Sequence, residues 1–146
     1  MDTSVVIAVT HKADIHHEKS RKLLQSILKE PKPKIYVSEY VFDESISVAL
    51  SKKWDISDEL RVQFIKKIYD ILYASRFFKV LHVDVLYSQA ITYFNEHRDL
   101  LASFTDWTNV AAMQIRGIRK ILSFDKHFDE IAKLKGFSYV QRIEQK

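Results

Sequence analysis

Four acidic residues lie where an α/β fold can bring carboxylates together. Asp125 directly follows the apolar, strand-like run from Ile121 to Phe124, within the stretch KILSFDKHF. Sites in open α/β sheets lie in the crevice outside the carboxyl ends of the strands. Asp2 and Asp106 stand where helices are expected to begin, and Glu44 lies on the inward face of another helix. These four positions are the candidates for chemistry.

Glu44 is the acid whose helical position is least expected. A helix over residues 38–53 places it on one face with Val41, Ser45 and Val48. Burying an unpaired charge costs free energy, so a carboxylate on this stripe calls for a partner. Asp43 points about 100° away on the same helix. We therefore expect Glu44, and not Asp43, to point inward.

Carboxylates that share one pocket repel each other, and hard divalent cations relieve that repulsion. Carboxylate oxygen favours Mg²⁺ or Mn²⁺ over softer metals. Such ions can activate water and stabilise a leaving oxygen at phosphorus. Taken singly, each acid has a simpler interpretation. Asp2, Asp106 and Asp125 can cap helices or favour the helix dipole, and Glu44 can pair with a lysine.

The elements that would carry these residues alternate along the chain. Helices are expected at residues 4–11, 15–29, 38–53, 58–75, 85–98, 106–116 and 128–135, and strands at 35–37, 77–83, 121–124 and 139–143. The capping residues are Asp14, Ser57, Ser103 or Thr105, and Gly117. This alternation predicts a three-layer α/β/α sandwich with a mostly parallel central sheet, formed by one domain over residues 1–146.

One expected helix has an explicit buried face. In the helix over residues 58–75 that face consists of Val62, Ile65, Ile68, Tyr69 and Leu72. The aromatic residues of this region serve either the core or a dimer face, and we favour the core: Phe64, Tyr69, Tyr73, Phe77 and Phe78.

In order and position, the acids resemble those of the PIN-domain nucleases, in particular the VapC-like toxins. The resemblance rests on Asp2-Thr3-Ser4, on Glu44 after an apolar run, on Ser103-x-x-Asp106 opening a helix, and on SFDKHF from Ser123. Asp14 and His17 follow the first motif as well. The resemblance implies a cluster of Asp2, Glu44, Asp106 and Asp125 that binds Mg²⁺ or Mn²⁺ and cleaves RNA. It also implies an antitoxin partner and allows a homodimer.

Other polar side chains are secondary candidates. Ser4, Ser103 and Thr105 can donate to the carboxylates, although helix capping explains the latter two equally well. For the six histidines we favour surface or packing roles over metal binding. Lys126 and His127 could touch phosphate beside Asp125, and Trp107 is expected to pack in the core rather than stack on a base.

Composition restricts the class of protein. The chain has 146 residues, no cysteine, two glycines and two prolines, so a disulfide scaffold and a thiolate metal site are excluded. No stretch resembles a signal peptide or a membrane span, and we expect a cytoplasmic protein. The net charge is +4; without the four acids, 23 basic and 15 acidic residues remain, which suits a polyanionic substrate. Charge alone, however, favours an ordinary basic surface.

Two other functions remain open. A PIN-like module could bind RNA or protein without catalysis, and it would then show no divalent-metal site. Another phosphoryl-transfer enzyme fits poorly: Ser4 stands where an aspartyl-phosphate phosphatase needs an acid, and no P-loop sequence occurs.

The first strand of the fold is almost missing from this sequence. In the family the first aspartate ends a strand, but only Met1 precedes Asp2 here. We expect either that the natural chain begins several residues upstream or that another segment fills the gap beside residues 121–124.

Overall fold

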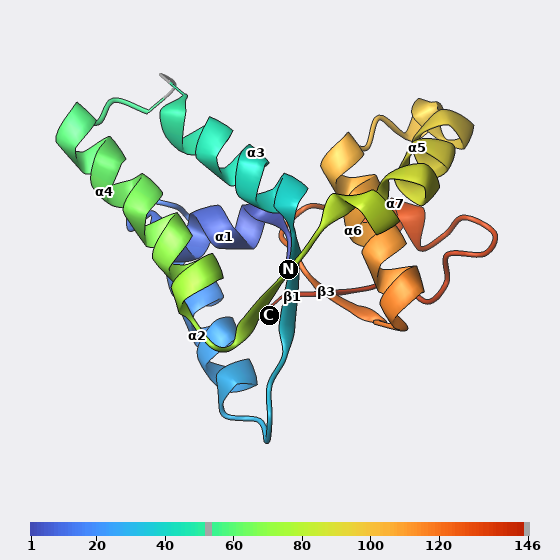
Figure 1. Ribbon diagram of the computed structural model, residues 1–146, viewed down its shortest axis with the longest axis horizontal. Helices are drawn as coiled ribbons and strands as arrows, with labels where there is room; N and C mark the ends of the chain where they lie inside the picture. The colour runs from blue at the N-terminus through green and yellow to red at the C-terminus, as the bar shows by residue number, and fades with distance from the viewer. Residues whose placement is uncertain (52–53, 145–146) are drawn as a thin grey trace.

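The computed structural model describes residues 1–51 and 54–144 as a helix-rich α/β fold (Figure 1). The α-helices are α1 (Thr3–Thr10), α2 (His17–Leu28), α3 (Glu39–Leu50), α4 (Asp58–Tyr69), α5 (Tyr87–Glu96), α6 (Phe104–Arg116) and α7 (His127–Ile131). The strands are β1 (Ile35–Ser38), β2 (Phe78–Leu81), β3 (Lys120–Leu122) and β4 (Gln141–Ile143). A π-helical turn (Asp70–Ala74) follows α4, and 3₁₀ turns (Val83–Val85, Arg98–Leu100) flank α5.

All described strand pairs are parallel, as the sequence predicts. β1 pairs with β2 and β3 pairs with β4, which gives two ribbons of two strands each. Met1 and Asp2 lie between the ribbons: the Met1 nitrogen donates to the Tyr36 carbonyl of β1 (2.7 Å), and the Asp2 N–H donates to the Leu122 carbonyl of β3 (3.0 Å). The central layer is therefore continuous only where residues 1 and 2 cross it.

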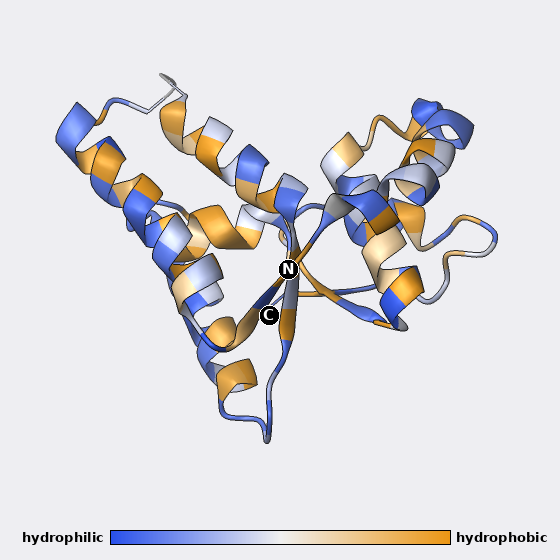
Figure 2. Ribbon diagram, viewed as in Figure 1, coloured by the Kyte–Doolittle hydropathy of each residue, from blue (hydrophilic) through white to orange (hydrophobic). Residues whose placement is uncertain are grey.

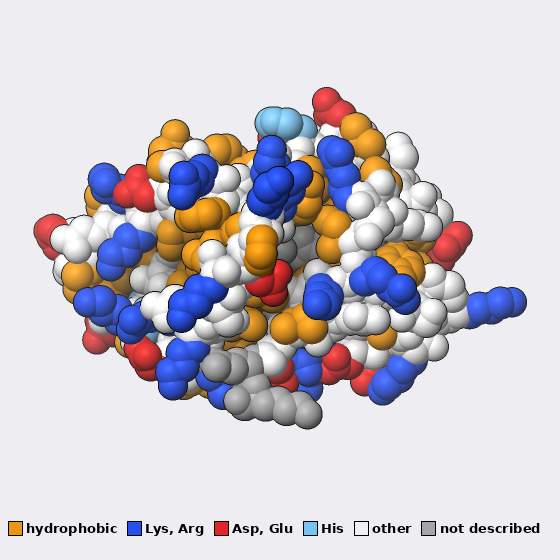
Figure 3. All heavy atoms as spheres, turned by 90° about the horizontal axis from the view of Figure 1, so that it is seen from below, with side chains coloured by type: hydrophobic (Ala, Val, Ile, Leu, Met, Phe, Trp, Pro, Cys, Tyr) orange, Lys and Arg blue, Asp and Glu red, His pale blue; other side chains and the backbone are white. Residues whose placement is uncertain are grey.

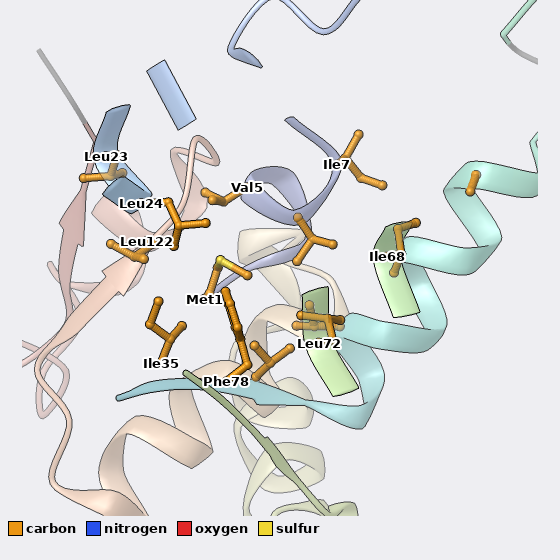
Figure 4. Close-up of a cluster of buried hydrophobic side chains, with 14 of the residues drawn as sticks. Met1, Val5, Ile7, Leu23, Leu24, Ile35, Ile68, Leu72, Phe78 and Leu122 are labelled. Atoms are coloured by element: carbon orange, nitrogen blue, oxygen red, sulfur yellow. The ribbon is translucent and has the colours of Figure 1, made fainter. Parts of the chain in front are cut away.

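Helices cover this layer on two sides, and each side has its own core (Figure 2). The first core joins α1–α4 and includes Val5, Val41, Ile68 and Leu72 (Figure 4). The second core joins α5–α7 and includes Trp107, Phe128 and Ile131. These layers form the three-layer α/β/α sandwich that the sequence predicts. Among the described residues, no helix is long and apolar enough to span a membrane.

Local capping sets the start of several helices. Ser38, Ser57 and Ser103 are N-caps whose side chains accept backbone N–H bonds, which otherwise lack partners in the first turn. Gly117 ends α6 with φ 63°, a left-handed conformation that suits glycine. The sequence choice between Ser103 and Thr105 as the cap is thus resolved in favour of Ser103.

Three local expectations were wrong. Asp14 does not cap α2; its side chain accepts the His16 N–H (2.7 Å), and the helix begins at His17. On α4, Val62 and Tyr69 are 65% and 53% exposed, whereas Phe64 is buried at 4%. Ile68 and Leu72 are buried as expected, and Ile65 is half-buried against the same core. The buried face therefore shares these residues with the expected stripe but includes Phe64 in place of Val62 and Tyr69.

Several expected ends also differ. α3 stops at Leu50, and Lys53, where we expected its end, lies outside the described residues. β3 ends at Leu122 and not at Phe124, and α7 is shorter than residues 128–135. In β3 the chain leaves the strand early because Ser123 and Phe124 turn toward α1, where their polar groups bond Asp2 and Ser4.

Candidate active site

Asp2 lies at the N-terminus of α1, between the two ribbons, and is only 4% exposed. Its Oδ2 accepts hydrogen bonds from the Ser4 hydroxyl (2.7 Å), the Ser4 N–H (3.3 Å) and the Ser123 hydroxyl (2.9 Å). Its Oδ1 accepts a bond from the Asn109 amide of α6 (3.2 Å). Donors from three separate segments thus fix this carboxylate. Asp2 therefore does more than cap α1.

Asp125 lies in the turn between β3 and α7 and is tied to the same network. The Ser123 hydroxyl donates to Asp2 and accepts the Asp125 N–H (2.9 Å). The Ser4 hydroxyl accepts the Phe124 N–H (3.0 Å). Ser123 is fully buried, so its one hydroxyl couples the positions of Asp2 and Asp125.

Asp106 is the third residue of α6 and takes part in a capping box with Ser103. Its Oδ2 accepts the Ser103 N–H (2.7 Å), and its own N–H donates to Ser103 Oγ (3.1 Å). Burial raises the pKa of Asp106 to about 7, and the nearby charges of Asp2 and Asp125 act in the same direction. Capping alone does not explain why this carboxylate is buried near two other acids, because a capping residue at a helix end can remain in contact with solvent.

Glu44 points from α3 toward the same place. Its carboxylate accepts a hydrogen bond from the Thr3 hydroxyl of α1, and Thr105 of α6 lies close by. Burial raises its pKa, and the charges of Asp2 and Asp125 raise it further, while the two threonine hydroxyls oppose the shift. The expected inward orientation of Glu44 is thus what the structure shows; Asp43 is exposed.

The four acids come from four segments, and the charges of Asp2 and Asp125 act on both Glu44 and Asp106. Within residues 1–51 and 54–144, no lysine or arginine forms an ion pair with any of them. Excess negative charge without a lysine or arginine partner is the condition that a hard cation relieves. One ligand atom each from Asp106, Asp125 and His127 lies within 4.8 Å of the others, which is close enough for one ion. The donor set fits a divalent metal.

His127 was not among the residues selected from the sequence as ligands. Its Nδ1 lies 2.9 Å from Asp125 Oδ1, but that oxygen already accepts the His127 N–H, and Nδ1 is buried without a hydrogen-bond partner in the described structure. The signal available in the sequence was its place two residues after Asp125. Asn109, one turn after Asp106 on α6, was also missed.

Other expectations about polar and aromatic side chains can be compared directly. Trp107 is 1% exposed and packs against Tyr93 and Phe137, so it belongs to the core. Ser4 donates to Asp2 as expected. Thr105 lies close to the Glu44 carboxylate, whereas the Ser103 N–H donates to the Asp106 carboxylate.

Comparison with known proteins concerns the family and fold of the chain. The family model described as the PIN domain matches residues 1–134. Among solved structures, the crystal structure of Mycobacterium tuberculosis VapC20, described as a Sarcin-Ricin loop cleaving toxin, is similar with a TM-score of 0.76. The two sequences are 21% identical over 99% of this chain and 97% of that chain, a level that establishes likeness of fold. No curated protein matches the sequence.

Proposed function

Because this chain belongs to the PIN-domain family, we propose that it is a divalent-metal-dependent endoribonuclease. Its site would consist of Asp2, Glu44, Asp106 and Asp125, with His127 beside them. The observation that carries the proposal is the convergence of four carboxylates without a lysine or arginine partner among the described residues. Burial raises the pKa values of Glu44 and Asp106, and the neighbouring acids add to the shift. Such a cluster is costly for the fold and is explained by a cation.

The proposed division of roles follows the contacts of each acid. Asp106, Asp125 and His127 are close enough to hold one Mg²⁺ or Mn²⁺, and Asp2 adds its charge from a position fixed by four donors. When bound, the ion supplies Lewis acidity and positive charge toward a scissile phosphate. Glu44, with its raised pKa, is placed to orient a water molecule and accept its proton.

RNA is the proposed substrate, and the surface charge suits it. Outside the four acids the chain carries 23 basic and 15 acidic residues, a charge of +8. A positive surface around an acidic site attracts a polyanion while leaving the carboxylates to the metal. The fold neighbour VapC20 is described as a Sarcin-Ricin loop cleaving toxin. We extend this to a toxin half of a toxin–antitoxin pair, held by a cognate antitoxin.

Cleavage of RNA by the purified chain tests the proposal. We expect cleavage with Mn²⁺ or Mg²⁺, loss of cleavage with chelator, and recovery when the metal is restored. Asp125→Asn should reduce the rate by at least about 100-fold, because it removes a charged ligand. The fold, followed by circular dichroism, should be retained.

The matched control is Asp43→Asn, the same change at an exposed acid of α3 that lies beside Glu44 in sequence. It should cleave at the wild-type rate. Absence of cleavage and of metal binding in the wild-type protein would contradict the proposal. RNA binding without either would favour the non-catalytic module.

A further inference from the structure

One arginine side chain of the second half of the fold is enclosed by its neighbours. Lysine and arginine side chains spread over the surface of the molecule, as Figure 3 shows for the face that carries the loop before β1. Arg142 of β4 differs from these, because its side chain is only 10% exposed. A buried guanidinium needs partners for its charge and its N–H groups, since leaving them unpaired costs free energy. The partners of Arg142 therefore indicate what this residue does.

The guanidinium of Arg142 contacts three groups at once. Its Nε and Nη2 donate to the two carboxylate oxygens of Asp129 on α7, at 2.9 and 2.6 Å. Its Nη1 donates to the main-chain carbonyl of Ser123 (3.4 Å) and lies 3.0 Å from the Glu144 carboxylate. A pair with two parallel hydrogen bonds fixes orientation as well as distance. Arginine suits this arrangement because its donors form a planar, rigid fork, which the lysine ammonium lacks.

Two of these partners stand at the two ends of the turn that carries the proposed metal ligands. Ser123 precedes Asp125, and Asp129 follows His127. Within the turn, the Asp125 N–H donates to Ser123 Oγ (2.9 Å), and the His127 N–H donates to Asp125 Oδ1 (2.9 Å). The Ser123 N–H also donates to a main-chain carbonyl of β4 (3.4 Å). Both ends of the turn are therefore fastened to β4.

Helix α7, at the far end of this turn, depends on outside contacts for its position. It has five residues, and a helix of that length has little stability of its own in water. Its inner side is packed, since Phe128 and Ile131 are fully buried. Apolar packing holds α7 against the core but is not directional. The ion pair between Asp129 and Arg142 adds a directional contact and joins the helix to the strand beside β3.

These contacts give Arg142 a geometric role and not an electrostatic one. Its ion pairs in the described part of the chain are with Asp129 and Glu144, neither of which belongs to the acidic cluster. Hydrogen bonds from Arg142 lower the pKa of Asp129, so both partners are charged at neutral pH. Burial and neighbouring acids shift the pKa values of Glu44 and Asp106. Loss of Arg142 should therefore displace the turn and leave the negative charge of the site in place.

We propose that Arg142 is a positioning residue for the turn that carries Asp125 and His127. Its guanidinium fastens both ends of the turn to β4 and thereby sets the distances of these two side chains from Asp106, with which they could hold one ion. The metal role of the three residues rests on the proposed function, whereas the fastening of the turn does not. Arg142 lies beyond residues 1–134, to which the PIN-domain model extends.

Arg142→Met tests the proposal, because it removes the donor fork and keeps an unbranched apolar side chain. At saturating Mn²⁺ we expect kcat for RNA cleavage to fall by about 10- to 100-fold, as for other residues that orient metal ligands. KM for RNA should stay within about twofold, because the buried side chain offers the RNA little surface. Affinity for Mn²⁺ should also fall by about 10- to 100-fold. Electron paramagnetic resonance of the free ion during a Mn²⁺ titration measures that affinity.

A second measurement needs neither metal nor RNA. Hydrogen exchange of the Asp125 and His127 amides in the metal-free protein reports how often the turn opens. In Arg142→Met these two amides should exchange at least about 10-fold faster, while interior amides of α3, in the other core, keep their rates. If the wild-type protein neither cleaves RNA nor binds metal, the proposed function fails, and this exchange experiment still decides whether Arg142 holds the turn.

Arg61→Met is the matched control for loss of a largely buried arginine. The Arg61 side chain is 13% exposed, and its Nη1 donates to the Ala49 and Ser51 carbonyls at the end of α3 (2.9 and 2.8 Å). Arg61→Met should lower the free energy of unfolding. It should leave kcat, the affinity for Mn²⁺ and the exchange rates of the turn amides within about twofold of wild type.

The double variant Arg142→Met/Asp129→Asn separates loss of the fastening from the effect of a carboxylate without its partner. Removing one partner of a buried pair leaves an uncompensated charge, whereas removing both charges does not. The double variant should therefore be at least as stable as Arg142→Met. Its kcat and its affinity for Mn²⁺ should stay as low, because the turn is still unfastened.

Three results would overturn the proposal. The first is wild-type exchange of the Asp125 and His127 amides in Arg142→Met, which would show that other contacts hold the turn. The second is an equal fall of kcat in Arg61→Met, which would assign the effect to a general loss of folding. The third is wild-type kcat in the double variant, which would assign the effect to the unpaired charge of Asp129.

Discussion

Among the single residues of the site, the acids are costly to bury, and Asp2 and Asp125 share a hydrogen-bond network. Asp106 carries most of the cost, since burial and two neighbouring acids raise its pKa to about 7. Ser123 carries much of the network, because one buried hydroxyl bonds both Asp2 and the backbone of Asp125. Asp106 thus controls the charge of the site, and Ser123 controls its geometry.

The metal-free protein should become less stable as pH rises from 5 to 8. The pKa of Asp106 is about 7 in the folded protein, raised from its ordinary value of 3.8. Between these values the folded state binds the extra proton, so unfolding releases it and stability falls as pH increases. The loss should be on the order of a few kcal/mol at most. Urea denaturation at several pH values, with chelator present, measures it.

Asp106→Asn provides the comparison for this pH effect. The amide cannot ionise but can still accept the Ser103 N–H, so the variant should lose most of the fall in stability between pH 5 and 8. A variant with the wild-type slope would show that Asp106 is not the titrating group.

Ser123→Ala should lower RNA cleavage and metal affinity by about 10- to 100-fold, as loss of a residue that orients ligands does. Its cost in stability should be about 1 kcal/mol. Ser45→Ala is the matched control, because Ser45 is equally buried but bonds only the Val41 carbonyl within α3. Equal loss of cleavage in both variants would assign the Ser123 effect to folding.

At the scale of elements, hydrophobic spacing located the helices better than it located their faces. Helix α4 contains apolar residues on more than one side, and its sequence alone permits two neighbouring stripes. Packing against α1 and α3 selects the stripe with Phe64, Ile68 and Leu72, which leaves Tyr69 stacked on Tyr73 at the surface. Since Tyr69 and Tyr73 are exposed, their role in a dimer face stays a prediction.

Two substitutions on α4 test this assignment of faces. Phe64→Ala should destabilise the protein by about 3–5 kcal/mol, because it leaves a cavity beside Trp54 and His11. Val62→Ala, on the exposed side, should change stability by less than about 0.5 kcal/mol. The free energy of unfolding in urea measures both, and the reverse ranking would contradict the observed register.

At the scale of the whole molecule, the candidate site lies where the two cores meet. Asp2 and Glu44 come from helices of the first core, and Asp106 and Asp125 come from segments of the second. Between the ribbons, residues 1 and 2 supply the main-chain bonds described above. A cation bound by these acids would therefore hold the two halves of the fold together.

Divalent metal should raise the Tm of the chain, and the rise should be larger at pH 8 than at pH 5. Metal binding requires ionised carboxylates, and at pH 5 Asp106 holds a proton. At a concentration 100 times Kd, binding would add about 2.7 kcal/mol. Thermal melts with Mn²⁺ and with chelator give the measurement; Asp125→Asn should show a smaller rise, and a rise independent of pH would place the ion elsewhere.

The order and type of most elements and the parallel pairing could be predicted from the sequence, because these depend on local spacing and capping. The four acids were selected by their order and position along the chain, and their joint role as a site stays a prediction. The apolar run before Asp125 and the serine before α6 are signals within a few residues of each other. The same holds for the inward face of Glu44, which follows from helical periodicity.

The contacts between these groups could not be predicted from the sequence. Asn109 and Ser123 bond Asp2 across more than 100 residues, and Thr3 bonds Glu44 from another helix. Such contacts depend on how the helices pack, which no local pattern encodes. The position of Met1 and Asp2 between the ribbons likewise follows from long-range pairing of β1 with β2 and of β3 with β4.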